Sequence, residues 1–222
     1  MGVAEPIKQH GVDVIALQEV DFDQSGDSQV LADIHANTEL RHIQRFPSSP
    51  SAFFPGGRAG VAVASRYPIV RKWEFTLPNP GLQITLGDRT YDSYDKGMLA
   101  CEIDADGRPL TLVSVHMFPF HMFERDADHD DFDEIWRALR QRLGELGTRR
   151  PLVVAGDFNT DNRGLLRDVD GRPLTGTTHG QVTHRGYAAD DILFSPEVPD
   201  PPPAQVLDTF SDHRLCLVDL RG

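Results

Sequence analysis

Cysteine is scarce in this sequence, which limits how the chain can be cross-linked. Only Cys101 and Cys216 occur, each within a short apolar segment. Two thiols in apolar, strand-like segments are typical of buried free cysteines rather than of a disulfide framework or a zinc cluster. We therefore expect both thiols to be free and buried.

Long apolar runs are also lacking. No stretch approaches the roughly 20 apolar residues that a membrane-spanning helix needs. The first residues lack the charged head and apolar stretch of a signal peptide. These absences predict a cytoplasmic protein without a transmembrane segment.

Positive charge is in short supply: 22 Lys and Arg residues stand against 34 Asp and Glu, so the formal net charge is −12. This balance opposes the attraction behind most non-specific nucleic-acid binding, although it leaves room for a local basic strip. Adjacent basic residues occur only at Arg71-Lys72 and Arg149-Arg150. Carboxylates gathered at a cation site would add to the same negative charge, which favours a metal enzyme acting on small or isolated phosphate groups.

The rest of the composition is that of an ordinary folded protein. Hydrophobic residues make up 39% and charged residues 25% of the chain, close to globular averages. A chain of 222 residues fits one domain. We interpret residues 1–222 as a single domain and expect a monomer.

Short apolar runs bounded by turn residues predict buried strands, and spaced apolar residues predict two helices. Residues 104–109 carry the turn residues of a β-hairpin, whereas residues 78–96 predict a long loop or a loose hairpin. Strands that alternate with helices but also pair as hairpins favour sheets covered by helices over one wound parallel sheet. The expected strands cover residues 12–17 (ending at Glu19), 60–65, 97–103, 110–116, 152–155, 191–194 and 214–220, and the expected helices cover 28–41 and 132–146.

Polar residues stand repeatedly where an apolar strand stops or starts. Active sites of layered folds collect at strand ends, so we expect these side chains to meet in one cleft. Taken singly, each has a simpler interpretation as a solvated residue, a core histidine or a turn whose side chain bonds its own backbone. The set consists of Glu19, His116, Asp157, Asn159, Asp190, Asp212 and His213.

In their order and spacing, the motifs resemble those of the endonuclease/exonuclease/phosphatase superfamily, which includes deoxyribonuclease-like nucleases, abasic-site endonucleases, sphingomyelinases and inositol-polyphosphate phosphatases. The resemblance runs from about residue 8 to the C-terminus. It implies an α+β fold, a four-layer α/β/β/α sandwich of two mixed β-sheets covered by helices. The motifs are Leu17-Gln18-Glu19-Val20, Ala64-Ser65-Arg66-Tyr67-Pro68-Ile69, Val115-His116, Gly156-Asp157-Phe158-Asn159, Asp190-Asp191-Ile192-Leu193 and Ser211-Asp212-His213.

The resemblance also implies how a metal ion and a water would be held. Glu19 looks like the principal Mg²⁺ ligand, because hard oxygen donors suit a cation that keeps waters and touches the substrate phosphate. Asp212 would bind the metal or a water, and Mn²⁺ is the alternative cation. Asp157 would orient or deprotonate the attacking water, and Asn159 would donate its amide to a non-bridging phosphate oxygen.

The histidines are expected to handle the phosphoryl group. His213 would contact it as it gains charge, held by Asp190 in the way a carboxylate fixes an imidazole tautomer. His116 would sit against the scissile phosphate as a general acid or a charge stabiliser. Ester hydrolysis at phosphorus needs an oriented water, neutralised oxygens and help for the leaving oxygen, so we expect a metal-dependent phosphoric ester hydrolase, of phosphodiesterase or phosphatase type.

The substrate class follows less directly from the sequence. Because the basic residues are dispersed, we favour a small phosphoester or a lipid headgroup as the substrate. A DNA or RNA endonuclease or exonuclease of the same family is the first alternative. A catalytically silent binding module that retains the fold is the second.

The chain departs from the family pattern at its N-terminal end. Members of the superfamily usually open with a buried strand whose Asn helps to hold the metal. Here 18 residues precede Glu19, and residues 1–9 contain no Asn and no β-branched run. We therefore expect a sandwich that lacks its first strand, which would impair metal binding. Our preferred explanation is a native start upstream of Met1, since losing a central strand would leave backbone groups unpaired.

Overall fold

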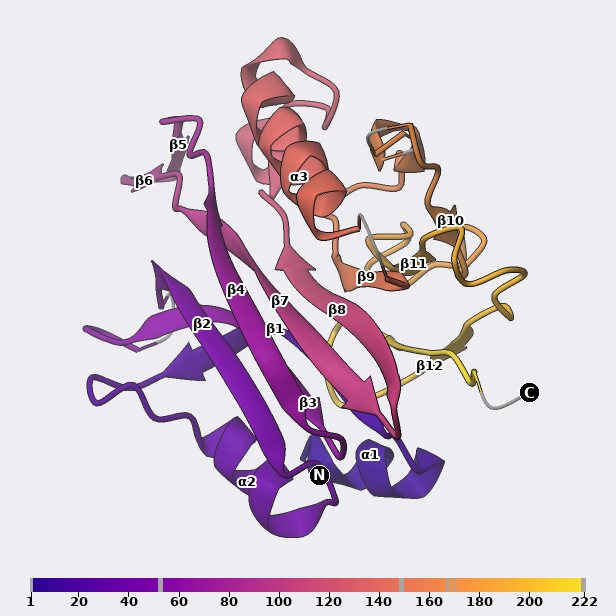
Figure 1. The fold of residues 1–222 in the computed structure, drawn as a ribbon. Coiled ribbons are helices and arrows are strands. Elements are labelled where there is room, and N and C mark those ends of the chain that lie inside the picture. Colours follow the sequence, from indigo (N-terminus) through magenta and orange to yellow (C-terminus); the bar gives the residue numbers. More distant parts are fainter. Residues whose placement is uncertain (1, 52–53, 148–149, 167, 170, 221–222) are drawn as a thin grey trace.

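The computed structural model describes residues 2–51, 54–147, 150–166, 168–169 and 171–220. Within them, two β-sheets pack face to face and helices cover the outer faces (Figure 1). This confirms the predicted α+β sandwich. Met1 and Arg149, which figure in the predictions above, lie outside the described residues.

The larger sheet has six strands in the order β10-β11-β9-β8-β7-β4. Neighbouring strands in this sheet are antiparallel, except that β8 and β9 are parallel. The chain returns between these two strands through helix α3 (Asp133–Leu146), as a parallel connection requires. The strands in sheet order span Thr175–Gly176, Asp190–Phe194, Leu152–Asp157, Arg108–His116, Lys96–Ala105 and Ile69–Leu77.

The smaller sheet has the order β1-β3-β2 and is antiparallel throughout its described strands, which span Val14–Phe22, Arg58–Ser65 and His42–Pro50. The parallel pairing is thus confined to the larger sheet. In β3, Val61 and Val63 pack between the sheets, whereas Ala62 and Ala64 pack under the outer helices. This alternation follows from the two-residue period of a strand.

Helices α1 (Ala4–His10) and α2 (Gln29–Asn37) cover the smaller sheet through buried side chains such as Ile7, Leu31 and Ile34. Among the described residues, no helix combines the length and the apolar character needed to cross a membrane. The remaining elements are 3₁₀ helices η1 (Phe120–Phe123), η2 (Asp130–Phe132) and η3 (Arg163–Leu166), and the hairpins β5–β6 (Gln83–Leu86, Arg89–Asp92) and β12–β13 (Gln205–Leu207, Leu215–Leu217).

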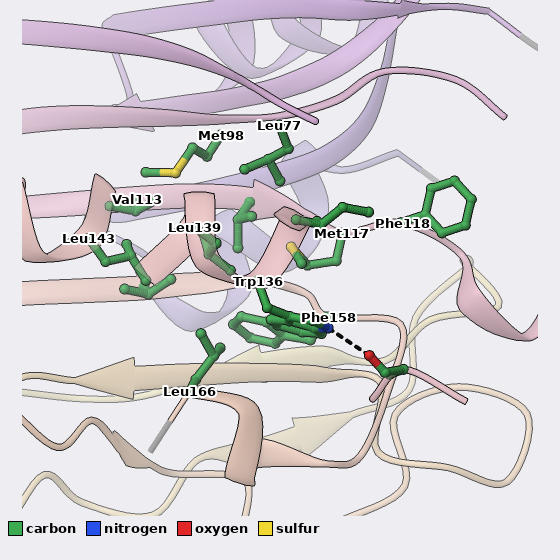
Figure 2. Close-up of a cluster of buried hydrophobic side chains, with 14 of the residues drawn as sticks. Leu77, Met98, Val113, Met117, Phe118, Trp136, Leu139, Leu143, Phe158 and Leu166 are labelled. Carbon is green, nitrogen blue, oxygen red and sulfur yellow. Dashed lines mark hydrogen bonds between the residues drawn. The ribbon is translucent and has the colours of Figure 1, made fainter. Parts of the chain in front are cut away.

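Helix α3 covers the larger sheet. Leu139 and Leu143 of the helix are fully buried against strand residues such as Met98 and Val113 (Figure 2). Trp136 stacks on Phe120, with ring centroids 5.5 Å apart, and its indole N–H donates to the Ala127 carbonyl oxygen at 2.7 Å. These contacts hold the segment after His116 in the core.

Several element boundaries differ from the sequence predictions. Helix α3 begins one residue later than predicted, whereas α2 ends at Asn37 because Thr38 adopts an extended conformation. The predicted loose hairpin at 78–96 contains β5 and β6. Both cysteines are free as predicted, but Cys216 is only partly buried.

Among the described residues, strand β1 forms an edge of the smaller sheet. A cavity of about 520 Å³ lies along this edge, and its lining includes no residue of β2 or β3. Apolar side chains line it from both sides, among them Val14 and Ala16 of β1 and Val153 and Ile192 of the larger sheet. The C-terminal segment, residues 214–220, also lines the cavity, which therefore lies between β1 and this segment.

Candidate active site

Glu19 lies on an irregularity within β1, whereas the sequence analysis placed it at the strand's end. The register with β3 shifts between Leu17 and Val20, and the strand then continues to Phe22. Glu19 itself has φ 53°, the left-handed conformation, and its side chain is 65% exposed. Bulges of this kind re-aim a side chain. The prediction that the strand ends at Glu19 was wrong, and the role of Glu19 as a metal ligand stays a prediction.

Gln18 ties this irregularity to the other sheet. Its side-chain amide donates to the Ser114 hydroxyl at 2.9 Å, and that hydroxyl donates to the Leu17 carbonyl oxygen at 2.9 Å. Ser114 belongs to β8, two residues before His116. In the Gln-Glu pair, Gln18 therefore has a structural role and helps to position Glu19.

His116 ends β8 and lies between two carboxylates. Its Nε2 is 3.8 Å from Glu19 Oε1 and 3.7 Å from Asp157 Oδ2, longer than hydrogen bonds. Burial lowers the pKa of this imidazole well below its ordinary value, and the nearby charges of Lys96 and His213 lower it further. The ring is therefore neutral at neutral pH.

Asp157 stands beside His116 because β8 and β9 run parallel with these two residues in register. Gly156 permits this approach: a Cβ at that position would lie 2.0 Å from the Val115 carbonyl oxygen. The glycine of the Gly-Asp-Phe-Asn motif is thus a packing requirement of the two strands. Its consequence is a carboxylate held at the end of a rigid sheet.

The Asp157 carboxylate is buried and electrostatically strained. Burial raises its pKa to about 6, and the charges of Asp190 and Glu19 act in the same direction. The backbone N–H of Asn159 donates to Asp157 Oδ1 at 2.8 Å and, with His213, opposes this rise. A buried carboxylate whose proton affinity is raised by neighbouring negative charges is typical of a site that binds a cation.

Asn159 is held in the left-handed conformation with φ 52°, which Asn tolerates better than most residues. Its side-chain amide donates to the Met117 carbonyl oxygen at 3.0 Å. The NH₂ group has two hydrogens, so one stays available for a substrate oxygen. The Asn159 side chain can therefore hold the local structure and still donate a hydrogen bond to a substrate.

Arg163 holds the loop that follows β9. Its guanidinium lies 4.8 Å from the Phe158 ring centroid and donates to Asp191 Oδ2 at 3.1 Å and to the Ala188 carbonyl oxygen at 2.8 Å. These bonds join the Asp157–Asn159 turn to the start of β11. Sequence reasoning did not identify Arg163, and no motif distinguishes it from other arginines.

His213 is paired with Asp190. Strand β11 places Asp190 opposite Asp157, and Asp190 Oδ2 lies 2.8 Å from His213 Nδ1. This hydrogen bond raises the pKa of His213 to about 9, so the imidazole is a cation at neutral pH. The Ser211 hydroxyl accepts the His213 backbone N–H at 3.1 Å, which explains the serine of the Ser-Asp-His motif.

The Asp212 carboxylate lies within 4.8 Å of a His213 ring nitrogen, and its partners are Arg185 and His184. Its Oδ2 lies 3.2 Å from Arg185 Nη2 and 3.8 Å from His184 Nδ1. In the described part of the chain, the groups with donor atoms close enough to share an ion are Asp157, Asp190 and His213, and His184, Asp212 and His213. Neither contains Glu19, so the structure does not bring the two predicted metal ligands together.

Three further residues surround the site. The His184 ring stacks on His213 with centroids 4.0 Å apart, and Tyr187 packs edge-on against His184. Lys96 Nζ lies 3.3 Å from His116 Nε2. The sequence did not predict these three residues, because none of them belongs to a family motif.

Comparisons with known proteins agree with this geometry. The sequence model of the Endonuclease/Exonuclease/phosphatase family matches residues 2–213. An 80-residue stretch is 34% identical to the human serine/threonine-protein kinase LMTK1, but it spans 35% of this chain and only 6% of that protein. So small a part of a kinase indicates neither its fold nor its activity.

Solved structures share the fold at low sequence identity. An endonuclease/exonuclease/phosphatase family protein from Leptotrichia buccalis has a TM-score of 0.70 at 18% identity, covering 98% of this chain and 91% of its own. The human Nocturnin catalytic domain, solved with a bound sulfate anion, has a TM-score of 0.65 at 19% identity (96% and 83% covered). A mannosyl-6-phosphatase from Bacteroides thetaiotaomicron has a TM-score of 0.62 at 17% identity (96% and 86% covered).

The matched region contains every motif described above, from the Gln-Glu pair on β1 to the terminal Ser-Asp-His turn. The two packed sheets and the cluster of Asp157, Asp190 and His213 at their ends fit that match. The chain belongs to the endonuclease/exonuclease/phosphatase family.

Proposed function

We propose that this protein hydrolyses phosphoester bonds with an activated water and a divalent cation. The observation that carries the proposal is the meeting of Asp157, Asp190 and His213, whose donor atoms lie within 4.8 Å of one another. His116 lies against Asp157 in the same cluster. A carboxylate base, a cationic imidazole and a neutral imidazole are the groups that this reaction needs.

Asp157 is the proposed base. Its pKa of about 6 makes it a stronger base than an ordinary aspartate while leaving it deprotonated at neutral pH. It would orient the water and accept its proton. Asn159 would donate its remaining amide hydrogen to a phosphoryl oxygen.

His213 and His116 have different proposed roles because their charges differ. His213, held protonated by Asp190, would neutralise the charge that develops on the phosphoryl oxygens. His116 is neutral and would act through hydrogen bonds at the scissile phosphate. The pair thereby places one positive and one uncharged ring around the reacting group.

Mg²⁺, with Mn²⁺ as the alternative, is the proposed cation. Glu19 would hold it, because this carboxylate stays open to solvent beside the buried Asp157. Asp212 would contribute through a bound water, after leaving its contact with Arg185. When bound, the cation would neutralise phosphate oxygens and lower the pKa of a coordinated water.

A small phosphoester or a lipid headgroup is the proposed substrate, on the basis of the net charge of −12. Two proteins of similar fold are a mannosyl-6-phosphatase and ANGEL2, a 2',3'-cyclic phosphatase, and both activities support a phosphoester as the substrate. Nucleic acid is the alternative that the same assay would reveal.

The test is a panel of phosphomonoesters, phosphodiesters, abasic DNA and choline phospholipids, each assayed with Mg²⁺ and with chelator. We expect turnover of at least one class that chelator abolishes. His213→Ala should remove turnover and leave folding nearly unchanged, whereas His35→Ala, on the exposed face of α2, is the matched control. No turnover of any class would favour a catalytically silent binding module, and full activity in His213→Ala would contradict the assigned role.

A further inference from the structure

Lys96 is a cation in the site to which the proposed reaction assigns no role. It is the first residue of β7, and the pairing of β7 with β8 sets Gly97 opposite His116. Its Nζ lies 3.3 Å from His116 Nε2 and 3.4 Å from His116 Nδ1. An ammonium almost equally far from both ring nitrogens is aligned with neither lone pair, so its N–H donors are not well used by the ring.

The neighbouring carboxylates do not satisfy this ammonium directly. Glu19 and Asp157 come within ion-pair distance of His116, but among the described residues no carboxylate reaches that distance from Lys96. The same two carboxylates nevertheless favour the charged form of Lys96 and counter the fall in pKa that burial causes. The site therefore contains a fixed positive charge that lacks a strong acceptor.

The backbone around Lys96 is held rigidly by the other sheet. The Ser49 hydroxyl donates to the Asp95 carbonyl oxygen. At Gly97, an added Cβ would lie 2.7 Å from the Phe46 ring, so β2 packs directly on this segment. Because these contacts hold the backbone on both sides of Lys96, the start of its side chain is positioned before a ligand binds.

His213 is a second cation near His116. Both Lys96 and His213 are near enough to lower the pKa of His116 electrostatically. A phosphoryl group placed against His116 would thus meet a positive charge from β7 and another from the Ser-Asp-His turn. Two fixed charges stabilise a dianion more than a monoanion, which is the difference between a phosphate monoester and a diester near neutral pH.

We propose that Lys96 is a substrate-binding residue whose ammonium contacts the non-bridging oxygens of the phosphoryl group, and that it makes a terminal phosphate monoester the preferred substrate. This inference rests on the proposed function. The chemistry on which it depends is anion binding by a compact ammonium with three donors, which can be measured without turnover.

The binding experiment uses inorganic phosphate as the probe and isothermal titration calorimetry as the measurement. Lys96→Met keeps the length of the side chain and removes its charge, and we expect its phosphate affinity to fall on the order of 10- to 100-fold, as for loss of a charged hydrogen bond. Lys96→Arg should recover part of the affinity. Lys72→Met is the matched control, since Lys72 lies on β4 in an exposed pair with Glu74.

The kinetic experiment compares kcat/KM for p-nitrophenyl phosphate and bis(p-nitrophenyl) phosphate. We expect Lys96→Met to lower the ratio of monoester to diester activity, while Lys72→Met leaves it unchanged. Should Lys96→Met not fold, the rate of lysine acetylation in the wild-type protein, with and without phosphate, tests whether phosphate binds at Lys96. We expect phosphate to protect Lys96 and not Lys72.

The outcomes separate this inference from the proposed function. Wild-type phosphate affinity in Lys96→Met, or no protection of Lys96, would overturn the inference even if the enzyme is active. Phosphate binding that depends on Lys96, in a protein that hydrolyses none of the esters, would support the inference and reject the hydrolase. An unchanged monoester-to-diester ratio would overturn the specificity part.

Discussion

Replacing Asp190 with Asn tests the pairing that sets the charge on His213. The Asp190 carboxylate accepts a hydrogen bond from His213 Nδ1 at 2.8 Å and raises the pKa of that imidazole from 6.5 to about 9. Asn keeps the size and one oxygen acceptor but removes the charge. We expect the pKa of His213 to fall toward 6.5, so that the ring is neutral at about pH 8 in the variant.

The size of the effect follows from the same pKa change. A rise from 6.5 to about 9 corresponds to about 3 kcal/mol, at roughly 1.36 kcal/mol per pKa unit. Because the His213 side chain is 28% exposed, solvent screening reduces this to about 1–2 kcal/mol. A raised folded-state pKa stabilises fully below about pH 6.5, and this stabilisation is lost as the pH rises through about 9. Asp190→Asn should therefore cost about 1–2 kcal/mol near pH 6 and little at high pH.

The assay is an NMR titration of the histidine ring protons, combined with urea unfolding at low and high pH. Asp208→Asn is the control, because Asp208 forms an ion pair with Arg214 at 2.7 Å but its side chain is 83% exposed. That substitution should change neither the His213 pKa nor its pH-dependent stability. A wild-type His213 pKa near 6.5, or one that Asp190→Asn leaves unchanged, would refute the reasoning.

Three further predictions concern packing and pH. Gly156→Ala should destabilise the fold by about 2–4 kcal/mol in urea unfolding, because its Cβ would meet the Val115 carbonyl oxygen at 2.0 Å; wild-type stability would contradict the close approach of β8 and β9. Trp136→Phe should cost about 1–3 kcal/mol by leaving the Ala127 carbonyl without its donor, and a thermal melt indistinguishable from wild type would count against that bond. The carboxyl of Asp157, with its pKa raised to about 6, is protonated at lower pH, so kcat/KM should fall as the pH is lowered through about 6; a flat profile there would exclude it as the base.

Local patterns in the sequence predicted much of the layered architecture. The apolar stripe of α3 and the hairpin turn between β7 and β8 both follow from short-range periodicity and turn residues. Strand β2 (His42–Pro50) was not predicted, because it contains Pro47 and lacks alternation. It forms because β3 supplies a partner, and the register irregularity between Phe46 and Ser49 accommodates the proline.

The sequence by itself identified the candidate residues that carry the family motifs. Asp157, Asn159, Asp190 and His213 stand beside apolar strands, and their order in the chain identified the family. These properties are local, because a strand end and a turn are encoded by neighbouring residues. Neither the charge state of His213 nor that of His116 is local in this sense.

Only the tertiary structure decided how these groups are charged and what surrounds them. The irregularity that turns Glu19 outward depends on pairing with β3, and the separation of Asp212 from Glu19 depends on where the C-terminal turn packs. Lys96 reaches His116 only through the register of β7 with β8. Such contacts join residues far apart in the chain, and their energies arise from burial and from charges that no short sequence pattern contains.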